Sequence, residues 1–338
     1  MKKFKIPLTK VLIIRFSSIG DIVLTTPVVR NLFQQMHEGA EIHFLTKTRF
    51  KSLLEPNPYV TKVYGIEKST NEIIEELKEE KYDYVIDLHV NLRSARVKRA
   101  LKMISCSFKK YNWQKWLLVN FGINKMPKVH IVDRYMETLK PFSIENDDKG
   151  LDYFFPEGED ALPSELPASH KAGYVAVAIG AAHWRKKPRI EQYIEICQKI
   201  NYPIVLLGGP SEEKDGNEIA TASGEQIWNA AGKLSLHGSA ALLRDSKLVI
   251  TPDTGMMHIA SAFKKPIISF WGATVPDFGM YPYLNKNLDE RIAADHLGKR
   301  PCSKLGTKCK YKECRCIDEL PIEKAIESAN SQIGLSTP

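Results

Sequence analysis

Short apolar runs recur along this sequence, and segments that favour helices separate them. The clearest runs are Val11–Ile14, Tyr174–Ile179, Ile204–Leu207 and Leu248–Ile250. Strands are also expected at the less apolar segments Glu41–Leu45, Tyr84–Leu88 and Pro266–Phe270, with a further extended segment around Val60–Ile66. Continuous apolar runs of this length are typical of strands that are buried on both faces of a parallel sheet. Strands that alternate with helices form βαβ units with right-handed crossovers. The pattern therefore predicts an α/β fold, with Pro266–Phe270 as the last clear strand.

The segments between the runs predict the helices. We expect one helix from near Asp21 to about Met36 and another from about Ser211. Further helices are expected at Asn71–Glu80, Ser94–Lys102, Trp113–Asn120, Asp133–Leu139, Ile190–Ile200, Leu236–Leu243, Gly255–Ala262 and Leu320–Ala329.

The alternation stops near the middle of the chain and then restarts. Between residues 145 and 172, acidic residues and three prolines exclude a long helix. A chain of 338 residues is long enough for two domains of about 150 residues each. We expect two Rossmann-like, doubly wound domains that face a central cleft, with ligands at the carboxyl ends of the strands. Their expected bounds are 1–165 and 166–318, followed by a C-terminal helix and tail at 319–338.

The composition excludes several classes of protein. Hydrophobic residues make up 43% of the chain and charged residues 26%, which excludes a disordered chain. The longest nearly apolar run, Tyr174–Ala182, is too short to span a membrane. Lysines and a proline interrupt Met1–Lys10, where a signal peptide would need an apolar core. We therefore expect a cytoplasmic protein.

Basic residues are concentrated in two stretches. From Arg93 to Arg134, eleven lysine or arginine residues stand against one acidic residue, a net charge of +10 in 42 residues. From Lys299 to Arg315, seven basic residues stand against Glu313. Such stretches attract phosphate-rich partners, which include nucleic acid, anionic lipid and phosphorylated glycans. The alternative for either stretch is a solvated basic face without a partner.

Four of the six cysteines lie close together, at Cys302, Cys309, Cys314 and Cys316. Their spacing, C-x6-C-x4-C-x-C, lacks the C-x2-C pairs of common zinc sites. Disulfides are rare in cytoplasmic proteins. We expect ordinary thiols in a loop, and zinc is the alternative.

A connection between a buried strand and a helix contains Asp253, Thr254 and Gly255. Asp253 or Thr254 can cap the helix, and Gly255 allows the backbone to approach a ligand closely. The first amides of the helix lie at the positive end of its dipole and form a site for an anion. His258 lies one turn further along the helix. The alternative is an ordinary capped helix with a satisfied histidine.

A basic loop follows the strand that ends near Gly180. Arg185, Lys186, Lys187 and Arg189 would complement a diphosphate at the helix described above. A solvated basic loop would have the same composition.

A third loop, Arg15–Gly20, leads from the first strand to Asp21. This carboxylate would lie at a helix start on the carboxyl edge of the sheet, where it can be an N-cap or a general base.

Motifs for common nucleotide and metal sites are absent from the sequence. It contains no G-x-G-x-x-G fingerprint, no G-x4-G-K-[ST] loop and no Asp-x-Asp pair for a divalent cation. We expect no cofactor and no metal at the site. If a nucleotide diphosphate binds, Lys186 and helix amides would take the role of a metal.

Taken in order, these segments closely resemble the lipopolysaccharide heptosyltransferases, which are glycosyltransferases of the GT-B fold that use an ADP-activated heptose. The resemblance covers residues 11 to about 280. It is carried by Phe16–Pro27, Phe44–Lys47, Leu54–Val60, Val85–His89 with Leu92–Ser94, Asp133–Tyr135, Arg185–Lys187, Leu206–Gly209, Asp253–Gly255 with His258, and Trp271–Thr274. It implies an acceptor site on the first domain, a donor nucleotide site on the second, and an inverting mechanism without a metal.

The resemblance also implies the residues of the donor site. Lys186 and the amides of Thr254 and Gly255 would hold the ADP phosphates. Pro188 directly follows Lys187, which departs from the family pattern and leaves the choice between Lys186 and Lys187 open. The remaining donor contacts would be Asp253, His258 and either Glu212 or Glu213, the last of these at the ribose.

On the first domain, the resemblance makes Asp21 the general base. Acceptor contacts are expected at Ser18, Gly20, Arg93, Arg96 and Arg134. The basic stretch would suit an anionic, lipid-linked glycan, reached by a peripheral protein on the inner face of the inner membrane.

The leading hypothesis is transfer of a heptose from an ADP-activated donor to the lipopolysaccharide inner core, onto Kdo or heptose on lipid A. One alternative keeps the fold and the chemistry but changes the nucleotide sugar or the acceptor. Another is a non-catalytic module whose basic stretches bind nucleic acid, although no nucleic-acid-binding motif is present.

Overall fold

The computed structural model describes residues 8–36, 39–285, 288–311 and 313–334. Most of Met1–Lys10, where no signal peptide was expected, therefore lies outside the described residues, as does Lys312 of the second basic stretch. The chain divides into two compact units. The first comprises residues 1–110 and 129–157, and the second comprises residues 111–128 and 158–338.

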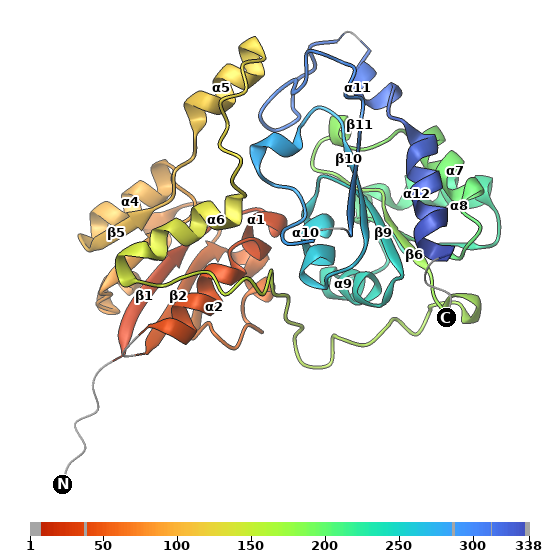
Figure 1. Ribbon diagram of the computed structural model, residues 1–338. Coiled ribbons are helices and arrows are strands. Elements are labelled where there is room, and N and C mark those ends of the chain that lie inside the picture. Colours follow the sequence, from red (N-terminus) through yellow and green to blue (C-terminus); the bar gives the residue numbers. More distant parts are fainter. Residues whose placement is uncertain (1–7, 37–38, 286–287, 312, 335–338) are drawn as a thin grey trace. The chain divides into compact units, whose positions relative to one another are not determined.

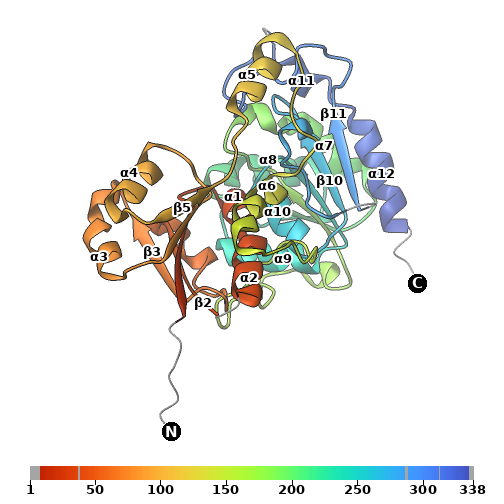
Figure 2. The same ribbon diagram turned by 60° about the vertical axis from the view of Figure 1, so that its left-hand side comes forward.

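The first unit is built on a sheet of five parallel strands in the order β3-β2-β1-β4-β5 (Figure 1). The strands are β1 (Thr9–Ile14), β2 (Ala40–Lys47), β3 (Lys62–Ile66), β4 (Tyr84–Asp87) and β5 (Ile104–Ser107). Helices α2 (Thr26–Gln35) and α6 (Ile131–Met136) lie on one side of this sheet, and α3 (Ile74–Glu79) and α4 (Leu92–Leu101) lie on the other (Figure 2). The side chains of Val11–Ile14 are completely buried between these layers.

The second unit contains six parallel strands in the order β11-β10-β9-β6-β7-β8. The strands are β6 (Val175–Ala178), β7 (Ile204–Leu207), β8 (Ile227–Asn229), β9 (Leu248–Pro252), β10 (Ile267–Trp271) and β11 (Asp289–Ala293). On one side of the sheet lie α7 (Ile190–Lys199), α8 (Glu213–Ser223) and α12 (Ile322–Gly334), and on the other lie α9 (Leu236–Asp245) and α10 (Gly255–Ala262) (Figure 1).

Both sheets are Rossmann-like, so the predicted α/β class is confirmed. The strand order reverses between β1 and β4 in the first unit and between β6 and β9 in the second. At such a point the two following loops turn to opposite faces of the sheet and leave a crevice for ligands. The loops after these four strands contain most of the residues singled out in the sequence.

The expected helix from Asp21 to Met36 is two helices, α1 (Ile19–Val23) and α2. Pro27 explains the break, because it has no N–H to donate to the carbonyl oxygen of Val23. That oxygen accepts the hydroxyl of Thr26 at 2.8 Å instead.

Three strands were not predicted, and each lies at the edge of a sheet: β5, β8 and β11. The expectation that Pro266–Phe270 is the last strand was therefore wrong, since β11 follows it. Edge strands are often short or charged, because an apolar edge would pair with other chains. Strand β8 has only three residues, and β11 begins with three charged side chains.

Helix α5 (Asn112–Phe121) departs from the expected domain bounds, because residues 111–128 belong to the second unit. Leu118 and Met126 pack there against Val275 and Phe278. As a consequence, the basic stretch is divided: its lysines at 115, 125 and 128 belong to the second unit.

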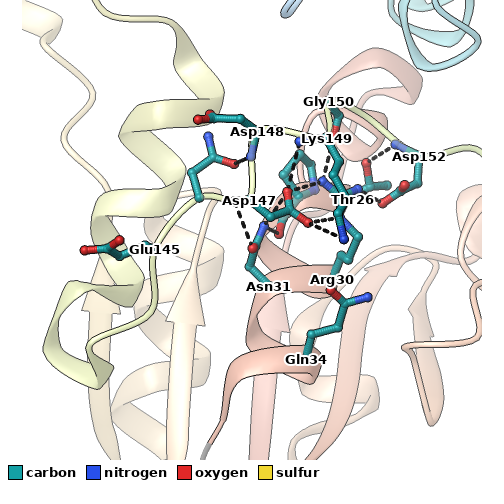
Figure 3. A network of polar contacts seen from close by, with 12 residues as sticks. Thr26, Arg30, Asn31, Gln34, Glu145, Asp147, Asp148, Lys149, Gly150 and Asp152 are labelled. Atoms are coloured by element: carbon teal, nitrogen blue, oxygen red, sulfur yellow. Dashed lines mark hydrogen bonds and ion pairs between the residues drawn. The ribbon is translucent and has the colours of Figure 1, made fainter.

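A buried arginine attaches the start of the proline-containing segment 145–172, which we expect to connect the two domains, to the first unit (Figure 3). Nε and Nη2 of Arg30 each donate to one carboxylate oxygen of Asp147 at 2.8 Å. Arg30 also pairs with Asp152 and donates to the carbonyl oxygen of Gly150 at 2.8 Å. These contacts hold the segment on α2. Hydrogen bonds from Arg30 lower the pKa of Asp147 to about 2, whereas burial raises the pKa of Asp152.

We predict that Asp147→Asn lowers the free energy of unfolding by about 1.5–3 kcal/mol at pH 6, the usual contribution of hydrogen bonds to a charged group. The pKa of Asp147 is lower in the folded state than the ordinary value of about 3.9. Its contribution is therefore complete above pH 4 and is lost as the pH falls toward 2. Urea denaturation across this range measures it.

The matched control is Asp148→Asn. Asp148 is exposed and has a φ of 53°, a conformation that asparagine tolerates well. An equal loss in both variants, or a loss at Asp147 that does not change with pH, would contradict the assignment.

Candidate functional site

At the carboxyl end of β1, the Arg15 side chain joins four parts of the first unit. Its Nη1 donates to the carbonyl oxygen of Leu88 at 2.5 Å and to the hydroxyl of Tyr135 at 2.9 Å. Its Nε donates to the carbonyl oxygen of Ser17 at 2.8 Å, and its Nη2 lies 2.5 Å from Oδ1 of Asp21. Only 10% of this side chain is exposed. The guanidinium therefore fixes the loops after β1 and β4 around one carboxylate. Arg15 belonged to the third loop, but the sequence did not indicate this anchoring role.

Asp21 occupies the third position of α1 and not the N-cap, which is Ser18. Its Oδ2 accepts hydrogen bonds from the backbone N–H and the hydroxyl of Ser18, at 3.0 and 2.9 Å. Burial raises the pKa of Asp21, but the Arg15 charge and the Ser18 hydrogen bonds outweigh it and hold the pKa below its usual value. The side chain is 20% exposed. Asp21 thus stabilises the helix start and remains an anion that solvent reaches.

His89 follows β4 and completes this group. Its ring packs edge-on against Phe16, with 5.0 Å between ring centroids. Burial, together with the positive charge of Arg15, lowers the pKa of His89 to about 4, so the ring is neutral at pH 7. Asp87 accepts the backbone N–H of His89 at 3.0 Å, and Nζ of Lys98 lies 3.0 Å from its other oxygen.

The expected acceptor contacts do not share one environment. Ser18 is exposed beside Asp21, and Gly20 is buried in α1. Arg93 and Arg96 are exposed on α4. Arg134 is different: no part of it is exposed. A side chain that solvent does not reach is poorly suited to bind a surface acceptor, and Arg134 belongs to the interior of the first unit.

In the second unit, an ion pair joins the loops after β6 and β9. Nζ of Lys186 lies 2.7 Å from Oδ2 of Asp253, and the hydroxyl of Thr274 donates to the same oxygen at 2.9 Å. These two loops lie on either side of the point where the strand order reverses. Asp253 thereby holds the Lys186 ammonium group beside the start of α10.

The N-cap of α10 is Thr254, whose side chain makes no capping hydrogen bond to the helix. Its hydroxyl lies 3.3 Å from that of Thr251 instead. The first amides of α10 therefore remain donors for an anion at the positive end of the helix dipole. Gly255 begins the helix, and the His258 side chain is buried one turn further along.

The other cations of the basic loop have partners elsewhere. Lys187 lies 3.3 Å from Oδ2 of Asp215, on α8, and Arg189 pairs with Asp318. Arg185 donates to a backbone carbonyl oxygen, that of residue 307, at 3.2 Å. Of the four cations predicted to converge on one diphosphate, Lys186 is the one whose ion pair reaches the loop before α10.

Glu212 and Glu213 point to different surroundings. Oε2 of Glu212 accepts the N–H of Gly209 at 3.0 Å, and a Cβ atom placed on Gly180 would lie 3.1 Å from that oxygen. Glu212 therefore lies between the ends of β6 and β7. Glu213 instead packs beside Gly232, since a Cβ atom placed on Gly232 would lie 3.0 Å from Cβ of Glu213. These surroundings favour Glu212 over Glu213 as the candidate for the ribose contact.

A long irregular segment, residues 294–314, packs against the Lys186 site. A Cβ atom placed on Gly306 would lie 2.8 Å from Cγ of Lys186, so the glycine leaves room for the lysine stem. Arg300 donates to the carbonyl oxygens of Trp271 at 2.6 Å and Thr274 at 3.2 Å. The sequence did not predict this contact, because a segment without periodicity gives no signal of what it covers.

The cysteine spacing had suggested ordinary loop thiols, but three sulfurs gather where this segment meets the short helix α11 (Arg315–Asp318). The Sγ atoms of Cys302, Cys309 and Cys316 all lie within 4.8 Å of one another. Among the described residues, the only other comparable group is Glu41, His43 and Glu80. Neither group includes Asp253 or Glu212.

Within the described part of the chain, no helix combines the length and the apolar character needed to cross a membrane.

Comparison with known proteins shows the family and the fold. Residues 70–312 match glycosyltransferase family 9 (heptosyltransferase). The chain is 29% identical over 278 residues to lipopolysaccharide heptosyltransferase 3 of Escherichia coli strain K12. The alignment covers 75% of this chain and 80% of that protein.

Two solved structures are similar in fold. The family 9 glycosyltransferase of Veillonella parvula DSM 2008 aligns with a TM-score of 0.76 and 21% identity over 98% of this chain and 99% of that one. The E. coli heptosyltransferase WaaC, solved with ADP, aligns with a TM-score of 0.65 and 21% identity over 95% of this chain and 100% of that one. These likenesses show the GT-B fold that the sequence predicted. Because the family match extends over more than half of its length, the chain belongs to glycosyltransferase family 9, the heptosyltransferases.

Proposed function

We propose that this protein transfers a heptose from ADP-heptose to the lipopolysaccharide inner core, with inversion at the anomeric carbon. Family membership supports a glycosyltransferase. The observation that carries the donor assignment is the ion pair between Lys186 and Asp253 beside the start of α10. Membership of an enzyme family leaves little support for the alternative of a non-catalytic nucleic-acid-binding module.

The leaving ADP needs positive charge where its own negative charge grows. Lys186 supplies an ammonium group, which the phosphates would share with Asp253, and the amides of Thr254 and Gly255 supply the helix dipole. Glu212 is placed to accept ribose hydroxyls, and Asp253 and His258 line the donor site. We propose that these groups act without a metal on the diphosphate, because Lys186 and the start of α10 already offer positive charge there.

We predict that ADP raises the unfolding temperature of the protein more than UDP or GDP does. Lys186→Ala should weaken ADP binding by about 1–3 kcal/mol, because a charge-assisted bond to the phosphates is lost. Lys187→Ala should bind ADP almost normally, since its ammonium group faces Asp215. Calorimetry measures both variants.

Three outcomes of this calorimetry would contradict the proposal. Wild-type affinity in Lys186→Ala would remove that residue from the site, and a loss confined to Lys187→Ala would exchange the two lysines. An affinity that needs magnesium and disappears in EDTA would overturn binding without a metal.

In the proposed transfer, an acceptor hydroxyl attacks the anomeric carbon as the bond to ADP breaks, and its proton passes to a base. We assign that base to Asp21, which is anionic and reached by solvent. Arg15 and Ser18 fix its orientation, and such fixed geometry favours proton transfer from a hydroxyl within about 3 Å.

We predict that Asp21→Asn folds and binds ADP normally but loses about 10²- to 10⁴-fold in turnover, the usual contribution of a general base. Asparagine can still accept the Ser18 N–H but cannot accept a proton. A base must be deprotonated to act, and the pKa of Asp21 lies below its usual value of about 3.9. The wild-type rate should therefore show no loss from Asp21 protonation between pH 6 and 8.

Transfer from ADP-heptose to Kdo–lipid A acceptors, with thermal unfolding in parallel, checks this prediction. Near-normal turnover of a folded variant would reduce Asp21 to a helix-stabilising residue. Transfer from another nucleotide sugar, or to another acceptor, would favour the second hypothesis.

For the acceptor we propose an anionic lipid-linked glycan, bound by a peripheral protein on the cytoplasmic face of the inner membrane. Helix α5 supports membrane contact. Trp113, Trp116 and Phe121 are 64%, 45% and 62% exposed, and the two indole rings stack with 4.9 Å between their centroids. In sequence, Lys115 lies between the two tryptophans, and Lys125 follows Phe121. Exposed aromatic rings with nearby cations are typical of surfaces that contact anionic lipid headgroups.

We predict that the protein binds vesicles that contain phosphatidylglycerol and that Trp113→Ser with Trp116→Ser weakens this binding at least tenfold. An aromatic side chain that leaves water contributes about 1.5–3 kcal/mol. Vesicle co-sedimentation measures the effect. Trp184→Ser is the matched control, since Trp184 is also 47% exposed. Equal binding by all three proteins, or no binding at all, would contradict a membrane role for α5.

A further inference from the structure

Four cysteines of the segment between β11 and α12 lie together, although up to fourteen positions separate them in the sequence. Cys302, Cys314 and Cys316 are almost completely buried, and Cys309 is half-buried. The sulfurs of Cys302, Cys309 and Cys316 lie within 4.8 Å of one another. The Cys314 side chain is in hydrogen-bond contact with that of Cys309. No disulfide joins them.

The spacing of the Cys302, Cys309 and Cys316 sulfurs fits one metal ion, and Cys314, in contact with Cys309, is the candidate for the fourth ligand. Four thiolates at about 2.3 Å around a tetrahedral ion lie about 3.8 Å from each other. A cluster of several iron atoms would hold its cysteines farther apart, because iron and sulfide atoms lie between them. The sequence alone could not indicate this, because the C-x6-C-x4-C-x-C spacing places no two cysteines in a C-x2-C pair.

Backbone donors also face the sulfurs. The N–H of Lys310 acts as a hydrogen-bond donor to Cys302, and the N–H of Tyr311 does so to Cys309. Donors around a metal-bound ligand fix its orientation and are part of a built site. Ordinary buried thiols do not require such donors, since they behave as small apolar groups.

The second basic stretch supplies compensating charge. A divalent ion with four thiolates carries a net charge of −2. Arg300 and Lys310 lie close enough for their charges to act on Cys316 and Cys302. Two cations of the second basic stretch, Arg300 and Lys310, thereby gain a physical reason.

The segment that holds the cysteines also needs a constraint. Residues 294–314 contain no helix or strand in their described part, and segments of this length without regular structure are uncommon in compact domains. Part of the segment packs into the core of the second unit through Leu297 and Cys302, and metal binding would add folding free energy directly.

From these contacts we propose that Cys302, Cys309, Cys314 and Cys316 bind a single thiolate-coordinated metal ion, for which Zn²⁺ is the expected occupant. The four thiols release their protons to solvent on binding. All four positions are filled by protein ligands, so the ion is structural and not catalytic.

The ion would order two neighbouring parts of the second unit. Lys304 donates to the side chain of Asn112 at 2.8 Å, and Lys310 donates to the carbonyl oxygen of Val119, so the segment holds α5 (Figure 2). On its other side, the N–H of Cys302 donates to the carbonyl oxygen of Ala273 at 3.0 Å, next to Thr274. The site itself does not depend on the proposed function.

Elemental analysis of the full chain, purified under reducing conditions without added metal, tests the proposal. We expect about one zinc per chain, and at least tenfold less in Cys302→Ser and in Cys316→Ser. The control is Cys106→Ser, on β5, which should keep its metal. About one iron per chain, lost in the same variants, would support a metal site at these cysteines and would show that iron and not zinc occupies it.

Cobalt substitution in the wild-type protein keeps the test decisive if the serine variants do not fold. A tetrahedral Co²⁺–thiolate site gives intense visible bands and sulfur-to-metal charge transfer in the near ultraviolet. Weak octahedral bands, a metal content unchanged in the folded variants, or a metal-free protein whose mass shows disulfides would overturn the proposal. Loss of activity in EDTA that zinc restores and magnesium does not would support it, and would leave metal-free diphosphate binding intact.

Discussion

Parallel pairing of β1 with β4, and of β6 with β9, is the constraint on which the rest of this structure depends. Parallel strands place all their carboxyl ends at one edge, and the reversal of strand order sends adjacent loops to opposite faces. The Arg15–Asp21 ion pair lies in the loop and helix start that follow β1. The Lys186–Asp253 ion pair joins the loops after β6 and β9. Each unit thus repeats one solution with different chemistry: an oriented carboxylate in the first, a cation beside a helix start in the second.

The central strands could be predicted from the sequence because burial on both faces demands continuous apolar runs, as in Val11–Ile14. The edge strands could not, because an edge carries its own protection against aggregation in the form of short or charged segments such as β11. The same reasoning separates the site residues. Asp253 follows its apolar run directly, and Asp21 and Lys186 lie in the loop regions after theirs, so their place at the sheet edge was predictable. The partner that each side chain selects depends on residues far away in sequence. The pairing of Lys187 with Asp215, the burial of Arg134 and the role of Arg15 therefore needed the three-dimensional structure.

The cysteine-bearing segment shows the limit of local patterns most clearly. Its spacing matches no common ligand motif, and its backbone has no periodicity, so each local signal indicates an ordinary loop. What distinguishes it is the convergence of sulfurs, backbone donors and cations, and these are properties of the folded chain. The same segment contacts the Lys186 stem through Gly306 and α5 through Lys304 and Lys310. Order in this segment and the geometry of the second unit are therefore linked.

Residues 111–128 leave the first unit, complete part of the second and return, so the backbone passes between the two units three times. Neither unit is therefore a contiguous fragment of the gene. A chimera that joins the first half of this enzyme to the second half of a relative at a single junction near residue 157 would separate α5 from Val275 and Phe278, the side chains on which Leu118 packs. Exchange of the whole second unit between family members by recombination therefore needs two coordinated replacements, because a single crossover does not transfer α5.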